Sequence, residues 1–63
     1  MTDLPKKELL RVDEVAAYFS LSPKTIYGWI DMGKLDAVRI GPFNVLRVPR
    51  ENVNRMVRGA LSS

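Results

Sequence analysis

The sequence predicts a small, mostly α-helical domain that carries one β-hairpin. Three observations support this prediction: apolar residues recur at helical spacing in three separate segments, residues 36–49 alternate apolar and cationic side chains on both sides of a turn, and the chain has only 63 residues. A chain of this length forms one domain and buries only about 60% of its unfolded surface. We expect the domain at residues 9–58, a flexible lead at 1–8 and a short tail at 59–63.

The first helix is expected at residues 12–19, preceded by a short extended piece at 9–10. Apolar residues at helical spacing lie on one face of this segment. Asp13 and Glu14 fall in the first turn, where the helix dipole favours negative charge. Arg11 occupies the cap position, where it offers no side-chain acceptor of the kind that Ser or Thr provides.

The second helix begins cleanly. Ser22 is a good capping residue, and Pro23 fits the first helical position because no amide donor is needed there. Gly33 is expected to end this helix. Only residues 20–21 separate the first two helices, so they meet through a tight turn, and we expect Leu21 to fill the space between them. This is the geometry of a helix-turn-helix.

The alternating stretch is expected to fold into a hairpin. The register that we expect pairs like residues across the turn: Arg39 with Arg47, Ile40 with Leu46, and Val38 with Val48. It leaves a three-residue loop, in which Pro42 and Phe43 suit a type I turn and Asn44 tolerates the left-handed conformation. One face is then apolar, and the other carries two opposed arginines that repel each other unless an anion lies between them. The hairpin forms a wing.

A third helix is expected after Pro49 and completes the core. Val53, Met56 and Val57 lie on one face of this segment, and Gly59 is expected to end it. The core residues expected from the first two helices and the segment that follows them are Val15, Phe19, Ile26, Trp29, Ile30 and Leu35.

Composition excludes most enzyme chemistry. The chain has no His and no Cys, which removes disulfides, imidazole or thiolate metal ligands, and cysteine or Ser-His-Asp nucleophiles. Asp13 and Glu14 are sequence neighbours and point to different faces of a helix, so they do not converge on a substrate. We therefore expect no enzyme activity, no catalytic residues, no metal site and no cofactor.

The charge is unevenly distributed. The net charge is +3, and residues 33–63 carry six Lys or Arg against two acids, whereas residues 1–32 carry four against five. This distribution favours a polyanionic partner. The apolar runs are far shorter than the ~20 residues that span a bilayer, and the first ten residues lack the features of a signal peptide. We expect a cytoplasmic protein that makes no membrane contact.

Two stretches, TIYGWIDMGKL at 25–35 and VRIG at 38–41, occur together and in this order. With them the chain resembles the excisionase-type, MerR-like winged helix-turn-helix domains of bacteria and phages, over about residues 9–58. Four positions depart from the family pattern: Arg11 replaces a usual Ser or Thr, and Ser20 replaces the usual turn glycine. Gly28 stands where members often carry arginine, and Pro23 fills a position that is often basic.

The resemblance implies sequence-specific binding of double-stranded DNA, with the second helix in the major groove and the wing on backbone phosphate. The candidate residues on the second helix are Ser22, Pro23, Lys24, Thr25, Tyr27 and Gly28, and those on the wing are Arg39, Phe43, Asn44 and Arg47. Each has a plainer alternative: Thr25 could only reinforce the cap, the arginines could only solubilise the hairpin, and Phe43 and Asn44 could only shape its loop.

By the same resemblance, the role is that of an excisionase-like recombination directionality factor or a small transcriptional regulator. A single module of this size binds modestly, so an integrase or another DNA-bound protein, or weak DNA-dependent self-association, is an expected partner beside the DNA. The alternative is a protein–protein adaptor or assembly subunit, for example in phage packaging, that uses the same fold.

Overall fold

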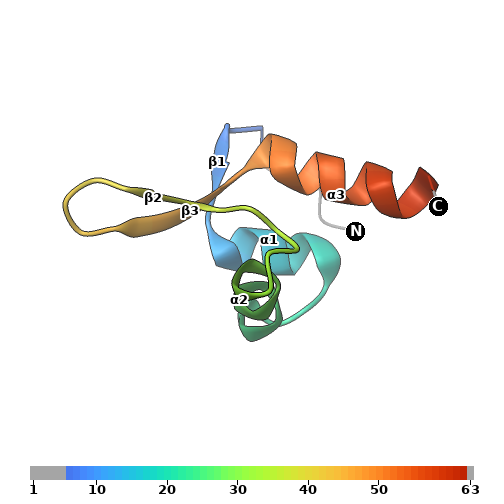
Figure 1. Ribbon diagram of the computed structural model, residues 1–63, viewed down its shortest axis with the longest axis horizontal. Coiled ribbons are helices and arrows are strands. Elements are labelled where there is room, and N and C mark those ends of the chain that lie inside the picture. The colour runs from blue at the N-terminus through green and yellow to red at the C-terminus, as the bar shows by residue number, and fades with distance from the viewer. Residues whose placement is uncertain (1–5, 63) are drawn as a thin grey trace.

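A computed structural model describes residues 6–62 and shows three helices packed with a small antiparallel sheet. The elements are, in chain order, β1 (Leu9–Leu10), α1 (Val12–Phe19), α2 (Pro23–Asp31), β2 (Val38–Ile40), β3 (Val45–Pro49) and α3 (Arg50–Ser62). Figure 1 shows the β2–β3 hairpin and α3 extending in opposite directions from the body that α1 and α2 form with the sheet. None of the helices within residues 6–62 is long and apolar enough to cross a membrane.

The turn between α1 and α2 depends on a left-handed residue. Ser20 has φ 58° and ψ 39°. Its N–H donates to the Ala17 carbonyl at 3.2 Å, and the Leu21 N–H donates to the Ala16 carbonyl at 2.9 Å. Together these bonds make a Schellman motif, which satisfies the last carbonyls of α1 and reverses the chain. The expectation that Leu21 fills the space between the helices is wrong: this residue is 42% exposed and does not belong to the core cluster.

The two ends of α2 follow the sequence prediction. The Ser22 hydroxyl oxygen accepts a hydrogen bond from the Thr25 N–H at 3.4 Å, and Pro23 is the first helical residue. At the other end Gly33 adopts φ 76°, and the Lys34 N–H donates to the Trp29 carbonyl at 2.9 Å. This second Schellman motif ends α2 and turns the chain toward β2.

The sheet has the order β1-β3-β2, with antiparallel pairing throughout. Leu10 pairs with Val48 and Leu9 with Pro49, which confirms the expected extended piece at 9–10. The Arg50 N–H donates to the Glu8 carbonyl at 2.8 Å and extends this pairing by one bond. Residues 1–5 of the expected lead lie outside the described part of the chain.

The hairpin forms, but the expected register is wrong by one residue. Val38 pairs with Arg47, Arg39 with Leu46, and Ile40 with Val45. Gly41 causes the difference, because its φ of 75° places it in the turn instead of the strand. The loop therefore has four residues, closed by the Asn44 N–H donating to the Gly41 carbonyl at 3.2 Å. Asn44 is left-handed, with φ 53°, as expected.

This one-residue difference exchanges the faces of the wing, because neighbouring residues of a strand point to opposite faces. Arg39 now shares a face with Leu46, and Arg47 shares the other face with Val38. The predicted pair of opposed arginines does not exist, and neither does the predicted uniformly apolar face. The mutual repulsion expected for that pair is therefore also absent.

The core is small and entirely apolar. Its buried residues are Leu10, Val12, Val15, Ala16, Ile26, Leu35, Val48 and Val53. Phe19, Trp29 and Ile30 were expected inside it, but they are only partly buried and pack against its edge. Phe19 and Trp29 meet edge to face, with ring centroids 5.4 Å apart. Trp29 thus covers one side of the core and does not lie at its centre.

α3 docks through its first turns. Val53 is fully buried, and Met56 packs against the core. The Asn52 side-chain amide donates to the Asp36 carbonyl at 3.0 Å, which ties α3 to the segment after α2. The expectation that Gly59 ends this helix is wrong, since α3 continues to Ser62. A single helical glycine costs only about 1 kcal/mol, which is not enough to stop a helix.

The left-handed conformation of Ser20 allows the strain in the turn between α1 and α2 to be tested. Ser20→Gly should raise the free energy of unfolding by roughly 0.5–1 kcal/mol, because glycine adopts this conformation without the penalty that a Cβ incurs. Gly33→Ala, at the equivalent position of α2, should lower it by a similar amount or more. Urea unfolding measures both changes. Equal stability of Ser20→Gly and the wild type would contradict a strained turn.

Candidate nucleic-acid interface

The N-terminal half of α2 presents most of the candidate helix residues to solvent. Lys24 is exposed and Tyr27 is 50% exposed. Thr25 is half-buried, and its hydroxyl lies 3.2 Å from the Ser22 hydroxyl, so it also reinforces the cap. The exposed residues of this half-helix are available to a partner, whereas Thr25 already has a local role.

A groove of about 380 Å³ lies between the start of α1, the first turns of α2 and the middle of β3. Its lining residues are Arg11, Val12, Asp13, Pro23, Tyr27, Leu46 and Arg47. Three predicted site residues from two distant segments, Pro23, Tyr27 and Arg47, therefore lie around one concave surface. The groove connects the exposed half of α2 with the base of the wing.

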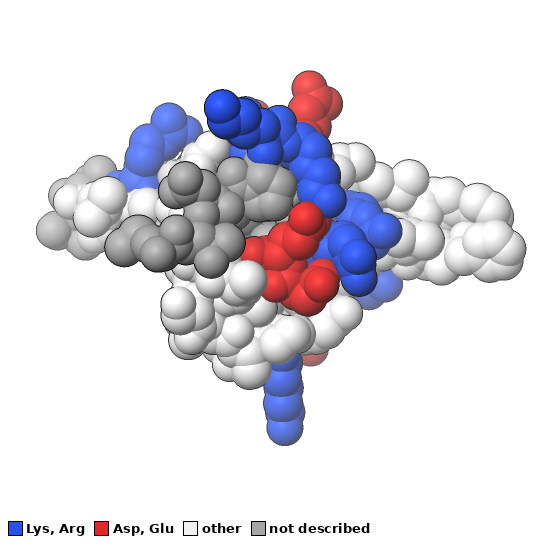
Figure 2. All heavy atoms as spheres, turned by 180° about the vertical axis from the view of Figure 1, so that it is seen from behind, with Lys and Arg blue, Asp and Glu red and all other residues white. Residues whose placement is uncertain are grey.

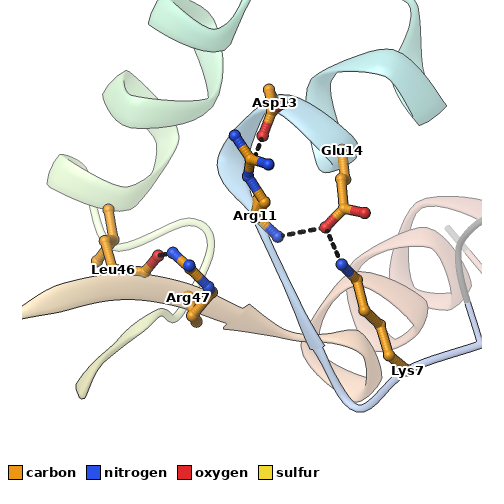
Figure 3. A network of polar contacts seen from close by, with 6 residues as sticks. All are labelled: Lys7, Arg11, Asp13, Glu14, Leu46 and Arg47. Atoms are coloured by element: carbon orange, nitrogen blue, oxygen red, sulfur yellow. Dashed lines mark hydrogen bonds and ion pairs between the residues drawn. The ribbon is translucent and has the colours of Figure 1, made fainter. Parts of the chain in front are cut away.

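Arg47 is the cation that β3 contributes to this groove. Its side chain is half-buried, and Nη1 donates to the carbonyl oxygen of Leu46 at 2.7 Å (Figure 3). No carboxylate of the described residues forms an ion pair with it. An arginine with no partner anion retains its full charge for a ligand, and its planar N–H fork suits a phosphate.

The other wall of the groove carries a chain of ionic contacts around the start of α1 (Figure 3). Arg11 Nε lies 3.2 Å from Asp13 Oδ1, and Lys7 Nζ lies 2.8 Å from Glu14 Oε1. The same Glu14 oxygen accepts the backbone N–H of Arg11 at 2.8 Å. Glu14 thus caps α1, although the Arg11 side chain provides no acceptor for this helix end.

These contacts shift the titration of Glu14. The hydrogen bond from the Arg11 backbone N–H lowers the pKa of the Glu14 carboxyl, and the hydrogen bond from Lys7 adds to this effect. Both stabilise the ionised form, which therefore holds the first turn of α1 together at neutral pH.

The wing carries the remaining candidates. Phe43 is 87% exposed at the tip, next to left-handed Asn44. Arg39 is exposed on β2 and points to the face opposite Arg47. Figure 2 shows Lys and Arg side chains gathered over the base of the wing beside acidic ones, and an uncharged far end. The positive charge of the wing thus lies near the body, while its tip presents an aromatic ring.

The structure brings together only some of the predicted residues. The groove includes Pro23, Tyr27 and Arg47 but not Lys24 or Gly28, which lie elsewhere on α2, nor Arg39 and the wing tip. Sequence reasoning missed Arg11 and Asp13 as members of this surface. The signal was present, because an arginine at a cap position serves no capping purpose.

Other site types find little support. Within the described ranges, no three His, Cys, Asp or Glu side chains lie close enough together to hold a metal ion. A second groove of about 390 Å³ lies beside the junction of β3 and α3, and it is lined by Glu8, Leu9, Pro49, Arg50 and Glu51. Its charges are mixed, with two carboxylates against one guanidinium, so it does not favour an anionic ligand.

Comparison with known protein families gives one match. The family described as "Helix-turn-helix domain" matches residues 9–60, which include both helices of the tight turn, the wing and most of α3. No curated protein matches the chain.

The Glu14 contacts generate a prediction for the pH dependence of stability. Because the pKa of Glu14 is lower in the folded protein than its ordinary value of 4.5, its contribution to stability is complete above that value and is lost as the pH falls through the folded pKa. Glu14→Gln should therefore be less stable at pH 7 and should lose less stability between pH 5 and pH 3.

Urea unfolding at several pH values measures this difference. Lys7→Gln is the matched control, because it removes the ion pair and leaves the hydrogen bond from the Arg11 N–H. The pH dependence of its free energy of unfolding should therefore fall between that of the wild type and that of Glu14→Gln. If the free energy of unfolding of Glu14→Gln depends on pH as steeply as that of the wild type, the capping contact of Glu14 contributes nothing to stability.

Proposed function

The chain belongs to the helix-turn-helix domain family, and from this membership and the geometry of α2 we propose that it binds double-stranded DNA sequence-specifically. α2 enters the major groove with Lys24 and Tyr27 toward the bases and nearby phosphates. Ser22, Pro23, Thr25 and Gly28 bring the backbone of this helix close to the DNA. The observation that carries the proposal is the groove in which Tyr27 of α2 lies together with Arg47 of β3, which has no ion-pair partner within residues 6–62.

The wing contributes the sequence-independent part of binding in this proposal. Arg47 contacts a backbone phosphate beside α2, and Arg39 contacts one farther along the DNA from the other face of the hairpin. Phe43 and Asn44 at the tip reach toward the neighbouring minor groove. The family resemblance also favours a biological role as an excisionase-like recombination directionality factor or a small MerR-like transcriptional regulator in a bacterium or phage.

The size of the domain sets a limit on its affinity. A single module with one recognition helix buries little DNA surface, so tight specific binding requires a second contribution. We propose that this comes from repeated sites with weak self-association, or from an integrase or other protein bound to adjacent DNA. The protein itself acts without enzyme chemistry and within the cytoplasm.

One observation favours a second function, that of a protein–protein adaptor. Val38, Ile40 and Val45 are each about 40% exposed and lie on the same face of the wing as Arg47, and Phe43 at the tip is 87% exposed. An apolar surface of this kind is also what an assembly subunit presents to a protein partner. Binding that is insensitive to salt and depends on these residues would support the adaptor.

The DNA proposal is tested with a duplex selected from a random-sequence pool. Lys24→Ala and Tyr27→Ala should each weaken binding to it, by about 1–3 kcal/mol where the side chain contacts a base edge. Lys34→Ala is the matched control, since it removes the same charge from an exposed residue just after α2. Fluorescence anisotropy measures the affinity, and thermal unfolding establishes that each variant is folded. Equal losses for Lys24→Ala and Lys34→Ala would contradict a specific role of α2.

A gain of affinity can be tested at Gly28. A Cβ added there meets nothing within 4 Å, so a side chain can leave the backbone at this position without an immediate clash. Gly28→Arg should strengthen binding to any duplex and steepen the dependence of log K on log salt by roughly one, because it adds one phosphate contact. Gly28→Gln is the control with similar helix propensity and no charge. The proposed orientation of α2 is wrong if the two variants bind DNA equally well.

A further inference from the structure

The groove beside α2 holds two arginines with different electrostatic surroundings. Arg47 has no ion-pair partner among the described residues, whereas Arg11 is held by Asp13 at the same groove. Asp13 is thus an anion of the protein itself, located where the proposed function places a phosphate of the DNA. Asp13 and a DNA phosphate therefore compete for Arg11.

The Arg11–Asp13 contact is weak enough to be replaced. The two side chains are 61% and 56% exposed, and exposed ion pairs contribute little because water screens them and their side chains lose entropy. The contact joins Nε of Arg11 to Oδ1 of Asp13 at 3.2 Å, and the guanidinium carries four further N–H groups on Nη1 and Nη2. A phosphate in the groove could therefore approach Arg11 while Asp13 competes for it.

The other charges near the groove are already balanced. Glu14 is paired with Lys7 and bonded to the Arg11 backbone N–H, so its position is fixed by two contacts. Asp13 has only the Arg11 side chain as its cationic partner among the described residues. Asp13 is therefore the acid whose environment changes most when an anion enters the groove.

On the basis of the proposed function, we propose that this groove is a two-arginine phosphate site, in which Arg11 and Arg47 bind one backbone phosphate and Asp13 is a built-in competitor that weakens binding. Tyr27 lines the same groove, and its side chain carries a hydroxyl that can act as a third donor. Asp13 lowers the affinity for every DNA sequence, so that contacts of α2 with the bases contribute a larger share of the binding free energy.

The proposal is tested by a double-mutant cycle on the selected duplex and on an unrelated one. Asp13→Asn should tighten binding to both about two- to fivefold at 0.1 M salt, the range that an exposed ion pair allows. Arg11→Gln should weaken binding to both and reduce the salt slope by roughly one. Asp13→Asn in the Arg11→Gln background should produce no gain, because the competition requires both partners.

Glu51→Gln is the matched control for net charge. It removes one negative charge from an exposed ion pair, with Arg55 at 3.6 Å, and neither residue lines the groove. Its effect on DNA affinity should be smaller than that of Asp13→Asn, since salt screens charges that are distant from the phosphate. Urea unfolding of each variant at the assay temperature shows that the compared proteins are folded.

The outcomes separate this inference from the proposed function. Equal gains for Asp13→Asn and Glu51→Gln, or a gain of Asp13→Asn that persists without Arg11, overturn the competition and leave DNA binding intact. A loss of affinity in Asp13→Asn overturns it too, because Asp13 would then position Arg11 for the phosphate. If the wild type binds no duplex at any salt concentration, the proposed function itself is wrong, and the phosphate site is rejected with it.

Discussion

The pairing of β3 with both of its neighbours determines the rest of this small structure. Val48 pairs with Leu10 of β1 and is fully buried, so this strand connects the sheet to the core. Because strand residues alternate between faces, placing Val48 in the core places Arg47 on the opposite side, at the groove beside α2. A slip of one residue would exchange these positions. The register of β3 therefore determines both the fold and the chemistry of the proposed interface.

Much of the helical structure could be predicted because it depends on local chemistry. Ser22 and Pro23 determine where α2 begins, and left-handed Gly33 determines where it ends, independently of distant contacts. The hairpin is predicted correctly, but its predicted register is wrong by one residue. Three- and four-residue loops both accommodate Asn44 in a left-handed conformation, and only the φ of Gly41 decides between them. The hydrophobic pattern favoured the wrong register, because that register gathers the apolar residues of both strands on one face, whereas the observed pairing divides them between the two faces.

The candidate site was predictable only in part, for a related reason. Lys24 and Tyr27 are exposed as the helical spacing indicates, but the groove depends on how three segments meet in space. Arg11 was recognised as an unusual cap residue, and only the structure shows that it lies at the same groove as Arg47. Contacts between segments 36 residues apart leave no local pattern in a single sequence. The helix-turn-helix family match supports the arrangement of elements and does not identify these side chains.

In the proposed complex, DNA contacts the exposed side of α2 and the groove that Tyr27 and Arg47 line. The most direct test is a nuclear magnetic resonance titration of ¹⁵N-labelled protein with the selected duplex, monitoring every backbone amide. The largest shift changes should fall at residues 22–28, 46–47 and 11–13. Changes confined to Val38, Ile40, Val45 or α3, or the absence of any change, would contradict DNA binding through α2 and the groove.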